Sequence, residues 1–330
     1  MKKVVNAFLV FVIFALFFSF TKNYVLVIPK GFPKPFIPED NLLTESRVEL
    51  GKKLFFDKIL SRDSTLSCAS CHVPQFAFTD RKKKGVGIRN QEVGRNTPTL
   101  TNIGYSDKFL LDGVNPSLVA QVMVPIHEKN EFDFHIILIA ERMKQDSDYV
   151  RLCKEAYNSE PNPYAITHAI ASFERTLISG NSKYDQFTYL GDSTALSSSQ
   201  QRGRQLFFEE LYCASCHNDF NFTNQALTNN GLYIAYPDSG RIRLTGLEQD
   251  RAVFKVPTLR NIAITYPYMH DGSIQTLSEV IDHYSSGGKS HPNKDSIITP
   301  FTLSETQKQD LIAFLHALSD SSFIDKSAYK

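Results

Sequence analysis

Two short stretches of the chain place two thiols and an imidazole at the same fixed spacing. They read Cys68-Ala69-Ser70-Cys71-His72 and Cys213-Ala214-Ser215-Cys216-His217. In a Cys-x-x-Cys-His pattern the two thiols add to the vinyl groups of a haem, and the adjacent imidazole binds the iron on one face. The two motifs therefore predict two covalently bound haems c, with His72 and His217 as the proximal iron ligands.

A zinc site and a redox-active dithiol are the alternative interpretations of these cysteines. A Cys₄ zinc site made from both pairs would need neither histidine at a fixed place beside the second thiol. A thioredoxin-like dithiol normally lies at a strand-to-helix turn in a βαβ context, which this sequence does not present. The haem interpretation is therefore preferred. The fifth cysteine, Cys153, is expected to be a small buried apolar residue.

The composition is that of an ordinary globular chain. Its 330 residues suffice for two domains, and 42% hydrophobic residues suffice for each domain to bury a core. The formal net charge is +1 without a basic face, which argues against nucleic acid as a partner.

The N-terminal residues have the pattern of an export signal. Lys2 and Lys3 precede an apolar run over 4–20, so residues 1–22 are predicted to be a signal peptide or a membrane anchor. Bacteria attach haem to Cys-x-x-Cys-His motifs outside the cytoplasmic membrane, so we expect a periplasmic protein. Whether the segment is cleaved or stays as an inner-membrane anchor is left open. Residues 23–41, which contain four prolines, are predicted to form an extended linker or arm.

The chain contains an internal repeat. Similar segments precede the two haem motifs and follow them, and an Asp-Gly pair comes fourteen residues after the first proline of each following segment. The matching segments are Gly51–Phe56 with Gly203–Phe208, and Pro98–Ile103 with Pro257–Ile262. This repetition predicts two tandem domains that arose by duplication.

Helical patterns dominate the rest of the sequence. Thr44 is expected to cap a helix through Phe56, and Ser198 with Gln201 to form the capping box of its counterpart through Leu211. Further helices are predicted over 166–178 and 304–318, and the second of them is expected to begin with a capping box of Ser304 and Gln307. The predicted fold is all-α, with two tandem c-type cytochrome domains over 42–190 and 191–330, each wrapped around one haem.

Two further motifs complete the pattern. They are Phe173-Glu174-Arg175-Thr176-Leu177, between the haem motifs, and Tyr268-Met269-His270-Asp271-Gly272, after the second. With the repeats, they resemble the bacterial di-haem cytochrome c peroxidase and MauG family over roughly 42–318. The resemblance implies that peroxide reacts at the N-terminal haem and that the C-terminal haem takes in electrons.

The expected activity is reduction of hydrogen peroxide to water with electrons from a small redox protein, such as a cytochrome c or a cupredoxin. One alternative is a MauG-like oxidase that uses peroxide to modify a partner protein. The other is a di-haem electron carrier without catalysis. A homodimer is a further arrangement that the sequence leaves open.

The resemblance also implies the residues of the peroxide site. Gln121, Pro125, Ile126 and Glu131 match the family's distal motif, with Glu131 and Gln121 as the catalytic residues. Cleaving the O–O bond requires a base that takes a proton from one oxygen and an acid that returns it to the other, and one carboxyl group can do both. Read without the resemblance, a glutamate at this position would be a surface residue.

The resemblance further implies one calcium ion between the haems. Its matching ligands are the side chain of Asn96 and the backbone carbonyls of Thr265 and Pro267. Oxygen ligands of this kind suit a hard cation. Without the resemblance, Asn96 reads as a turn residue before Thr-Pro.

The sequence departs from the family pattern at three places. Leu111 stands where the family usually has an inter-haem tryptophan, and Ile88 stands where many members have a distal histidine. The third place is the distal ligand of the C-terminal haem, for which Met269, His270 and Tyr284 compete. The resemblance favours Tyr284, which occupies the position of a methionine in ordinary members and of a tyrosine in MauG.

Overall fold

The computed structural model describes residues 22–325 and 329. In the first half of the chain the α-helices are α1 (Glu45–Phe56), α2 (Cys68–Cys71), α3 (Leu118–His127), α4 (Ile136–Met143), α5 (Ser147–Tyr157), α6 (Pro163–Glu174) and α7 (Lys183–Thr188). In the second half they are α8 (Ser198–Gln205), α9 (Ile242–Thr245), α10 (Leu277–Ser285), α11 (Glu305–His316) and α12 (Ser321–Ile324). Within the described residues, the strands are the two-residue β1 (Leu227–Thr228) and β2 (Phe254–Lys255), which pair antiparallel.

Single-turn helices occupy several of the connections. A π-helix over Leu206–Glu210 continues α8. The 3₁₀ turns are Glu39–Asn41, Lys58–Leu60, Pro74–Phe76, Ile88–Asn90, Ile103–Tyr105, Cys213–Ser215 and Glu248–Asp250.

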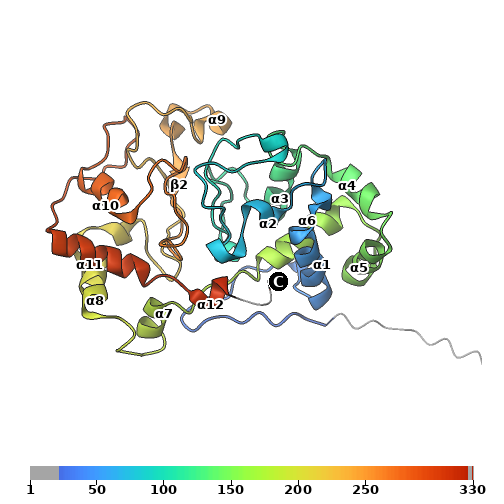
Figure 1. Cartoon of the computed structure of the whole chain (residues 1–330), viewed down its shortest axis with the longest axis horizontal. Coiled ribbons are helices and arrows are strands. Elements are labelled where there is room, and N and C mark those ends of the chain that lie inside the picture. The colour runs from blue at the N-terminus through green and yellow to red at the C-terminus, as the bar shows by residue number, and fades with distance from the viewer. Residues whose placement is uncertain (1–21, 326–328, 330) are drawn as a thin grey trace, which may run out of the picture.

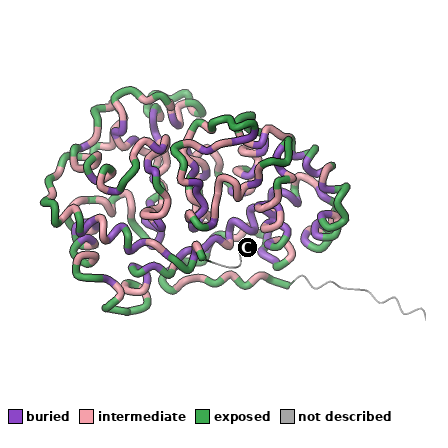
Figure 2. Tube along the Cα trace, in the orientation of Figure 1, coloured by how far each residue is buried: buried purple, intermediate pink, exposed green. Residues whose placement is uncertain are grey.

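The helices form two lobes that lie side by side (Figure 1). One lobe contains α1 to α6, the other contains α8 to α11, and α12 lies between them (Figure 1). Each lobe has its own core, and the buried parts of the trace follow the helices of both lobes (Figure 2). The predicted class, two tandem cytochrome c-type domains built mainly from helices, is confirmed. Cys153 lies fully buried in the first core.

The N-terminal residues divide into an undescribed and a described part. The predicted signal peptide or anchor lies outside the described residues, except for Lys22. Residues 23–41 are largely extended: they run beneath both lobes, turn at 30–31 and return to α1 (Figure 1). The arm is anchored by Phe32, whose ring centroid lies 4.6 Å from that of Phe220 in the second lobe. Among residues 22–325 and 329, no helix is both long and apolar enough to cross a lipid bilayer.

The two lobes are built on the same close approach of two helices. In the first, α1 packs against α6, and a Cβ added to Gly51 would lie 1.9 Å from the carbonyl oxygen of Ala169. In the second, α8 packs against α11, and a Cβ on Gly203 would lie 1.9 Å from that of Asp310. Because no carbon atom can approach an oxygen so closely, only glycine allows these contacts. The duplicated glycine of the sequence therefore has a packing function.

Replacing Gly203 with Ala is expected to lower the free energy of unfolding by about 1–3 kcal/mol, the usual cost of overpacking a core. Gly51→Ala should have a similar effect. Thermal unfolding of the holoprotein measures both changes. Gly94→Ala is the control, since no atom lies within 4 Å of a Cβ built there. If the Gly51, Gly203 and Gly94 variants had equal melting temperatures, the close packing of α1 on α6 and of α8 on α11 would be contradicted.

Two of the three predicted N-terminal helix caps are present in the structure. The Thr44 side chain accepts a hydrogen bond from Arg47 N, and α11 begins with the capping box of Ser304 and Gln307. The third prediction was wrong by one residue, because Ser197 with Gln200 forms the capping box of α8. Three consecutive serines and two consecutive glutamines span the start of this helix, so the pattern fits two registers equally well.

Buried polar side chains join the two lobes. Asn102 Nδ2 donates to the carbonyl of Ser179 at 3.0 Å, and Ser179 N donates back to Asn102 Oδ1 at 2.8 Å. The equivalent residue of the second repeat, Asn261, accepts from Asp320 N at 2.8 Å and donates to Ser179 Oγ at 3.1 Å. All four residues are buried. They fix the segment that follows α6 against the segment that follows α11.

Elements from each half of the chain complete the core of the other half. Tyr184 of α7 lies in the core of the second lobe, and its N–H donates to the carbonyl of Ala317. Conversely, the ring of Phe323 in α12 packs 5.5 Å from that of Phe78 in the first lobe, between centroids. Tyr329 lies on the same ring, at 5.1 Å. The hydrophobic cluster around Phe78 in the first lobe is therefore incomplete without Phe323 and Tyr329.

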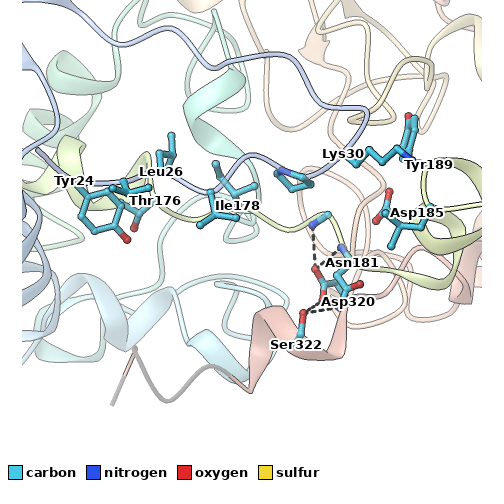
Figure 3. Close-up of a pocket in the computed structure, with 15 residues that line it drawn as sticks. Tyr24, Leu26, Lys30, Thr176, Ile178, Asn181, Asp185, Tyr189, Asp320 and Ser322 are labelled. Atoms are coloured by element: carbon cyan, nitrogen blue, oxygen red, sulfur yellow. Dashed lines mark hydrogen bonds between the residues drawn. The ribbon is translucent and has the colours of Figure 1, made fainter.

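A cavity of about 370 Å³ lies between the N-terminal arm and the segment over 176–181 (Figure 3). Asp320 is in its wall, with Oδ2 accepting hydrogen bonds from Gly180 N and Asn181 N, both at 3.0 Å (Figure 3). No residue of either Cys-x-x-Cys-His motif lines this cavity. The candidate chemistry lies elsewhere.

Candidate haem sites and peroxide pocket

A cavity in the first lobe contains the first motif. Its walls include both thiols and the imidazole: Cys68, Cys71 and His72. Four other polar side chains line it, among apolar ones: Ser67, Gln121, Glu131 and Glu174. A mostly apolar lining with a few polar groups is usual for small-molecule and cofactor sites.

Each motif histidine is oriented by a backbone carbonyl. His72 Nδ1 lies 2.9 Å from the carbonyl oxygen of Phe78, and His217 Nδ1 lies 3.1 Å from that of Phe222. Because a carbonyl oxygen only accepts, Nδ1 carries the proton in both rings, and Nε2 keeps its lone pair for iron. Burial lowers the pKa of both imidazoles, that of His217 to about 4, so both are neutral at pH 7. The donors at both motifs fit a haem.

Gln121 and Glu131 reach the first cavity from α3 and from the turn that follows it. Gln121 Oε1 is buried and has no hydrogen-bond partner among the described residues. Glu131 is half-buried, and its burial, with a smaller contribution from the charge of Glu128, raises its pKa to about 7. The structure thus places both predicted residues in one pocket with the first haem motif.

Ile88 occupies the position of the family's distal histidine, and it hydrogen-bonds the backbone of Glu131. Its side chain is buried, and its N–H donates to the carbonyl of Glu131 at 3.0 Å. The neighbouring Gly87 packs so closely that a Cβ there would lie 1.8 Å from the carbonyl oxygen of Asn130. The described residues that line the cavity include no histidine other than His72.

We expect the fully oxidised holoprotein to react with peroxide at once, without prior reduction. The reason is that Ile88 cannot bind iron and that, among the residues the structure describes, no second histidine lines the cavity. The N-terminal haem should then give a high-spin ferric spectrum. Stopped-flow mixing of oxidised protein with peroxide measures the reaction, and reactivity of only the half-reduced protein would contradict the expectation.

Glu174 is a cavity residue for which the sequence predicted no function. It is 5% exposed, and its Oε2 has no hydrogen-bond partner within the described chain. Burial raises its pKa to about 8, against an opposing effect of Arg175, so the carboxyl is mostly protonated at pH 7. In the sequence, Glu174 follows directly after the apolar run of α6. A carboxyl group at such a place is the signal that could have identified Glu174 as a buried site residue.

Near the second motif, the side chain of Asn230 contacts both Tyr284 and Met269, the two leading candidates for the distal iron ligand. Burial raises the pKa of Tyr284, a hydrogen bond with the Asn230 side chain lowers it, and the nearby Cys216 and Cys213 raise it further. Asn230 Nδ2 also donates to Met269 Sδ at 3.3 Å. Tyr284 and Met269 therefore meet beside one amide near the second motif. Asn230 was not predicted, because an Asn-Asn-Gly sequence reads only as a turn.

His270, the third candidate, lies in the interface between the lobes. Its ring stacks on Phe254 of β2, with centroids 4.0 Å apart. The next residue in β2, Lys255, donates its N–H to the carbonyl of Leu111 at 2.7 Å. The aromatic residue Phe254 of the second lobe thus lies close to Leu111, which occupies the position of the family's inter-haem tryptophan.

The predicted calcium ligands come from two segments that are in contact. Asn96 N donates to the carbonyl of His270 at 2.9 Å, which brings Asn96 beside the segment containing Thr265 and Pro267. Asn96 Nδ2 donates to the carbonyl of Lys82 at 2.8 Å, so only its Oδ1 is left for a cation. A calcium ion here stays a prediction.

Comparisons with known proteins agree with this arrangement. The family model described as di-haem cytochrome c peroxidase matches residues 45–194, and the cytochrome c model matches residues 200–319. Methylamine utilization protein MauG of Methylorubrum extorquens is 38% identical over 88% of this chain and 82% of its own. Cytochrome c551 peroxidase of Nitrosomonas europaea is 34% identical over 82% of this chain and 79% of its own.

A solved structure is also similar along the whole chain. It is that of a MauG-like protein associated with microbial copper homeostasis, 33% identical, with a TM-score of 0.87 over 93% of this chain and 99% of that one. Two cytochrome c-type domains imply two covalently bound haems c. The relatives include both MauG proteins and peroxidases. The chain therefore belongs to the di-haem cytochrome c peroxidase and MauG family.

Proposed function

We propose that this chain is an exported, periplasmic enzyme that reduces hydrogen peroxide to water in the cavity of the first lobe, with electrons that a partner redox protein delivers through the second lobe. One observation carries the proposal: the cavity that contains the first haem motif also contains Glu131, a carboxyl group with a pKa raised to about 7. A carrier without catalysis would need protein ligands on both faces of each iron. The described residues that line this cavity include no methionine and no second histidine.

The bound haem would supply the redox chemistry and the electrophilic iron. Glu131 accepts a proton from one oxygen of peroxide and donates it to the other oxygen, which leaves as water. The unpaired Oε1 of Gln121 accepts a hydrogen bond from the peroxide O–H and orients the molecule. Ile88 and Gly87 fix the backbone that carries the carboxyl group. Two electrons and two protons from outside complete the conversion to two water molecules.

The pH dependence of kcat/KM for peroxide should follow the ionisation of Glu131. The carboxylate is the base, and burial raises its pKa to about 7, so the active form is lost as the pH falls through about 7. Below that value the rate should fall about tenfold per pH unit. Glu128→Gln should move the inflection to lower pH, since the charge of Glu128 raises this pKa. A wild-type profile that is flat through neutral pH would contradict the assignment.

A second candidate is a MauG-like oxidase that takes electrons from the side chains of a partner protein. The observation that favours it is Tyr284, which lies near both thiols of the second motif. The family resemblance implies a tyrosine ligand in MauG and a methionine in ordinary peroxidases. A phenolate oxygen would stabilise higher oxidation states of the iron.

A steady-state assay of the holoprotein with peroxide and ferrocytochrome c tests the proposal. The peroxidase assignment predicts two ferrocytochromes oxidised per peroxide consumed. Peroxide consumption without ferrocytochrome oxidation, together with covalent change in a partner protein, would support the MauG-like candidate. An absence of peroxide consumption with either partner would contradict both.

A further inference from the structure

Three tyrosines form a row between the second haem motif and the protein surface: Tyr284, Tyr236 and Tyr233. Asn230 links the first two, because its side chain hydrogen-bonds Tyr284 and its Oδ1 lies 3.4 Å from the hydroxyl oxygen of Tyr236. The rings of Tyr236 and Tyr233 meet edge to face, with centroids 5.4 Å apart. The step from Tyr284 to Tyr236 runs through the Asn230 side chain, and the step from Tyr236 to Tyr233 is a direct ring contact, so an electron can pass along the row.

The outer tyrosine has a proton acceptor. The hydroxyl of Tyr233 donates to Asp271 Oδ2 at 2.7 Å, while Asp271 Oδ1 accepts from Ser273 N at 3.1 Å. A phenol that loses an electron becomes strongly acidic, so a carboxylate in hydrogen-bond contact makes its oxidation easier. The hydroxyl of Tyr236 donates instead to the amide oxygen of Asn229, at 3.2 Å. Because an amide is a very weak base, Tyr236 can relay an electron but lacks a comparable acceptor for its proton.

Tyr233 also lies where a partner can reach it. Its side chain is half-buried, and the neighbouring Ile234 is 70% exposed. Ala235 and Pro237 are exposed as well. This short apolar surface offers a contact for a redox protein or another bulky donor that is too large for the haem cavity.

We propose that Tyr233 is a surface oxidation site, at which a bulky one-electron donor or a partner protein gives up electrons without contact with either haem. The inference rests on the proposed function, since peroxide supplies the oxidising equivalents. It adds to that function a second place of electron exchange, separate from the cavity of Glu131.

The step balances in charge and atoms. Tyr233 gives one electron through Tyr236 to the oxidised haem pair, and its O–H proton moves to Asp271 Oδ2. The products are a neutral tyrosyl radical, a protonated Asp271 and a haem pair reduced by one electron. A donor at the surface then returns one electron to the radical, and the proton returns from Asp271. Two such cycles supply the two electrons that one peroxide molecule takes.

Rapid-freeze electron paramagnetic resonance of the holoprotein mixed with peroxide, without reductant, tests the proposal. We expect a tyrosyl radical whose hyperfine pattern collapses when the protein carries ring-deuterated tyrosine. Tyr233→Phe should abolish the signal. Asp271→Asn should also abolish it, although the ring remains, because the proton acceptor is gone. Peroxide consumption with a small reductant should be unchanged in Tyr233→Phe.

Tyr164→Phe is the matched control. Tyr164 is also partly exposed and has ring neighbours, but its hydroxyl donates to a backbone carbonyl, that of Asp40, which cannot take a proton. This variant should keep the radical. The same signal in Tyr233→Phe, or no tyrosyl signal in a wild-type protein that consumes peroxide, overturns the inference and leaves the proposed function intact. A wild-type protein that consumes no peroxide overturns the proposed function, and the inference with it.

Discussion

Glu131→Gln is expected to slow steady-state reduction of peroxide by about 10² or more, the usual scale for losing a positioned acid and base. The amide has the shape of the carboxyl group but cannot move a proton between the two oxygens. Both haems should remain attached, because the substitution leaves the cysteines and histidines of both motifs unchanged. Peroxide consumption with a saturating electron donor measures the rate, and the haem absorbance per protein measures attachment.

Glu128→Gln is the matched control for this variant. It removes a carboxylate from the same turn, but Glu128 is exposed and does not line the cavity. We expect it to retain most of the wild-type maximal rate. A Glu131→Gln protein that turns over as fast as wild type would exclude this carboxyl group from the reaction.

Tyr284→Phe should change the absorption spectrum of the C-terminal haem and raise its reduction potential. A phenolate oxygen stabilises ferric iron relative to ferrous iron, so its loss makes reduction easier. The expected shift is on the order of 0.1 V, within the roughly 0.8 V over which axial ligands set haem potentials. Spectroelectrochemical titration of the holoprotein measures the potential of each haem separately.

Met269→Leu distinguishes the two ligand assignments, because Met269 Sδ hydrogen-bonds the same Asn230 amide. If Tyr284 is the ligand, Met269→Leu should leave the C-terminal spectrum nearly unchanged. If Met269→Leu changes the spectrum while Tyr284→Phe does not, the ligand is the methionine and the ordinary peroxidase assignment gains support.

The features that the sequence predicts well are encoded within a few neighbouring residues. A Cys-x-x-Cys-His motif carries its whole donor set in five positions, and Ser304 with Gln307 encodes a helix start within one turn. The glycine of each duplicated stretch was visible as a repeat, whereas its reason, a backbone carbonyl 1.9 Å from an added Cβ, needed the packed helices. The pairing of Gln121 with Glu131 came from the family resemblance and not from their spacing alone.

The features that the sequence did not predict depend on contacts between distant segments. Glu174 reaches the haem cavity because α6 turns its buried face towards the first motif. Asn230 is 39 positions from Met269 in sequence, yet their side chains are in hydrogen-bond contact. Phe32 lies in a proline-rich stretch that reads as a free linker, but its ring packs against the second lobe. Local patterns contain no information about such partners.

The return of α12 to the first lobe has a consequence for the order of events during synthesis. The ribosome completes the helices of the first lobe long before it adds Phe323, which covers Phe78. The carbonyl of Phe78 is also the group that orients His72. The ring of Phe78 therefore stays uncovered on this side until Phe323 and Tyr329 have been added. The segment that orients His72 completes its packing only after this late step.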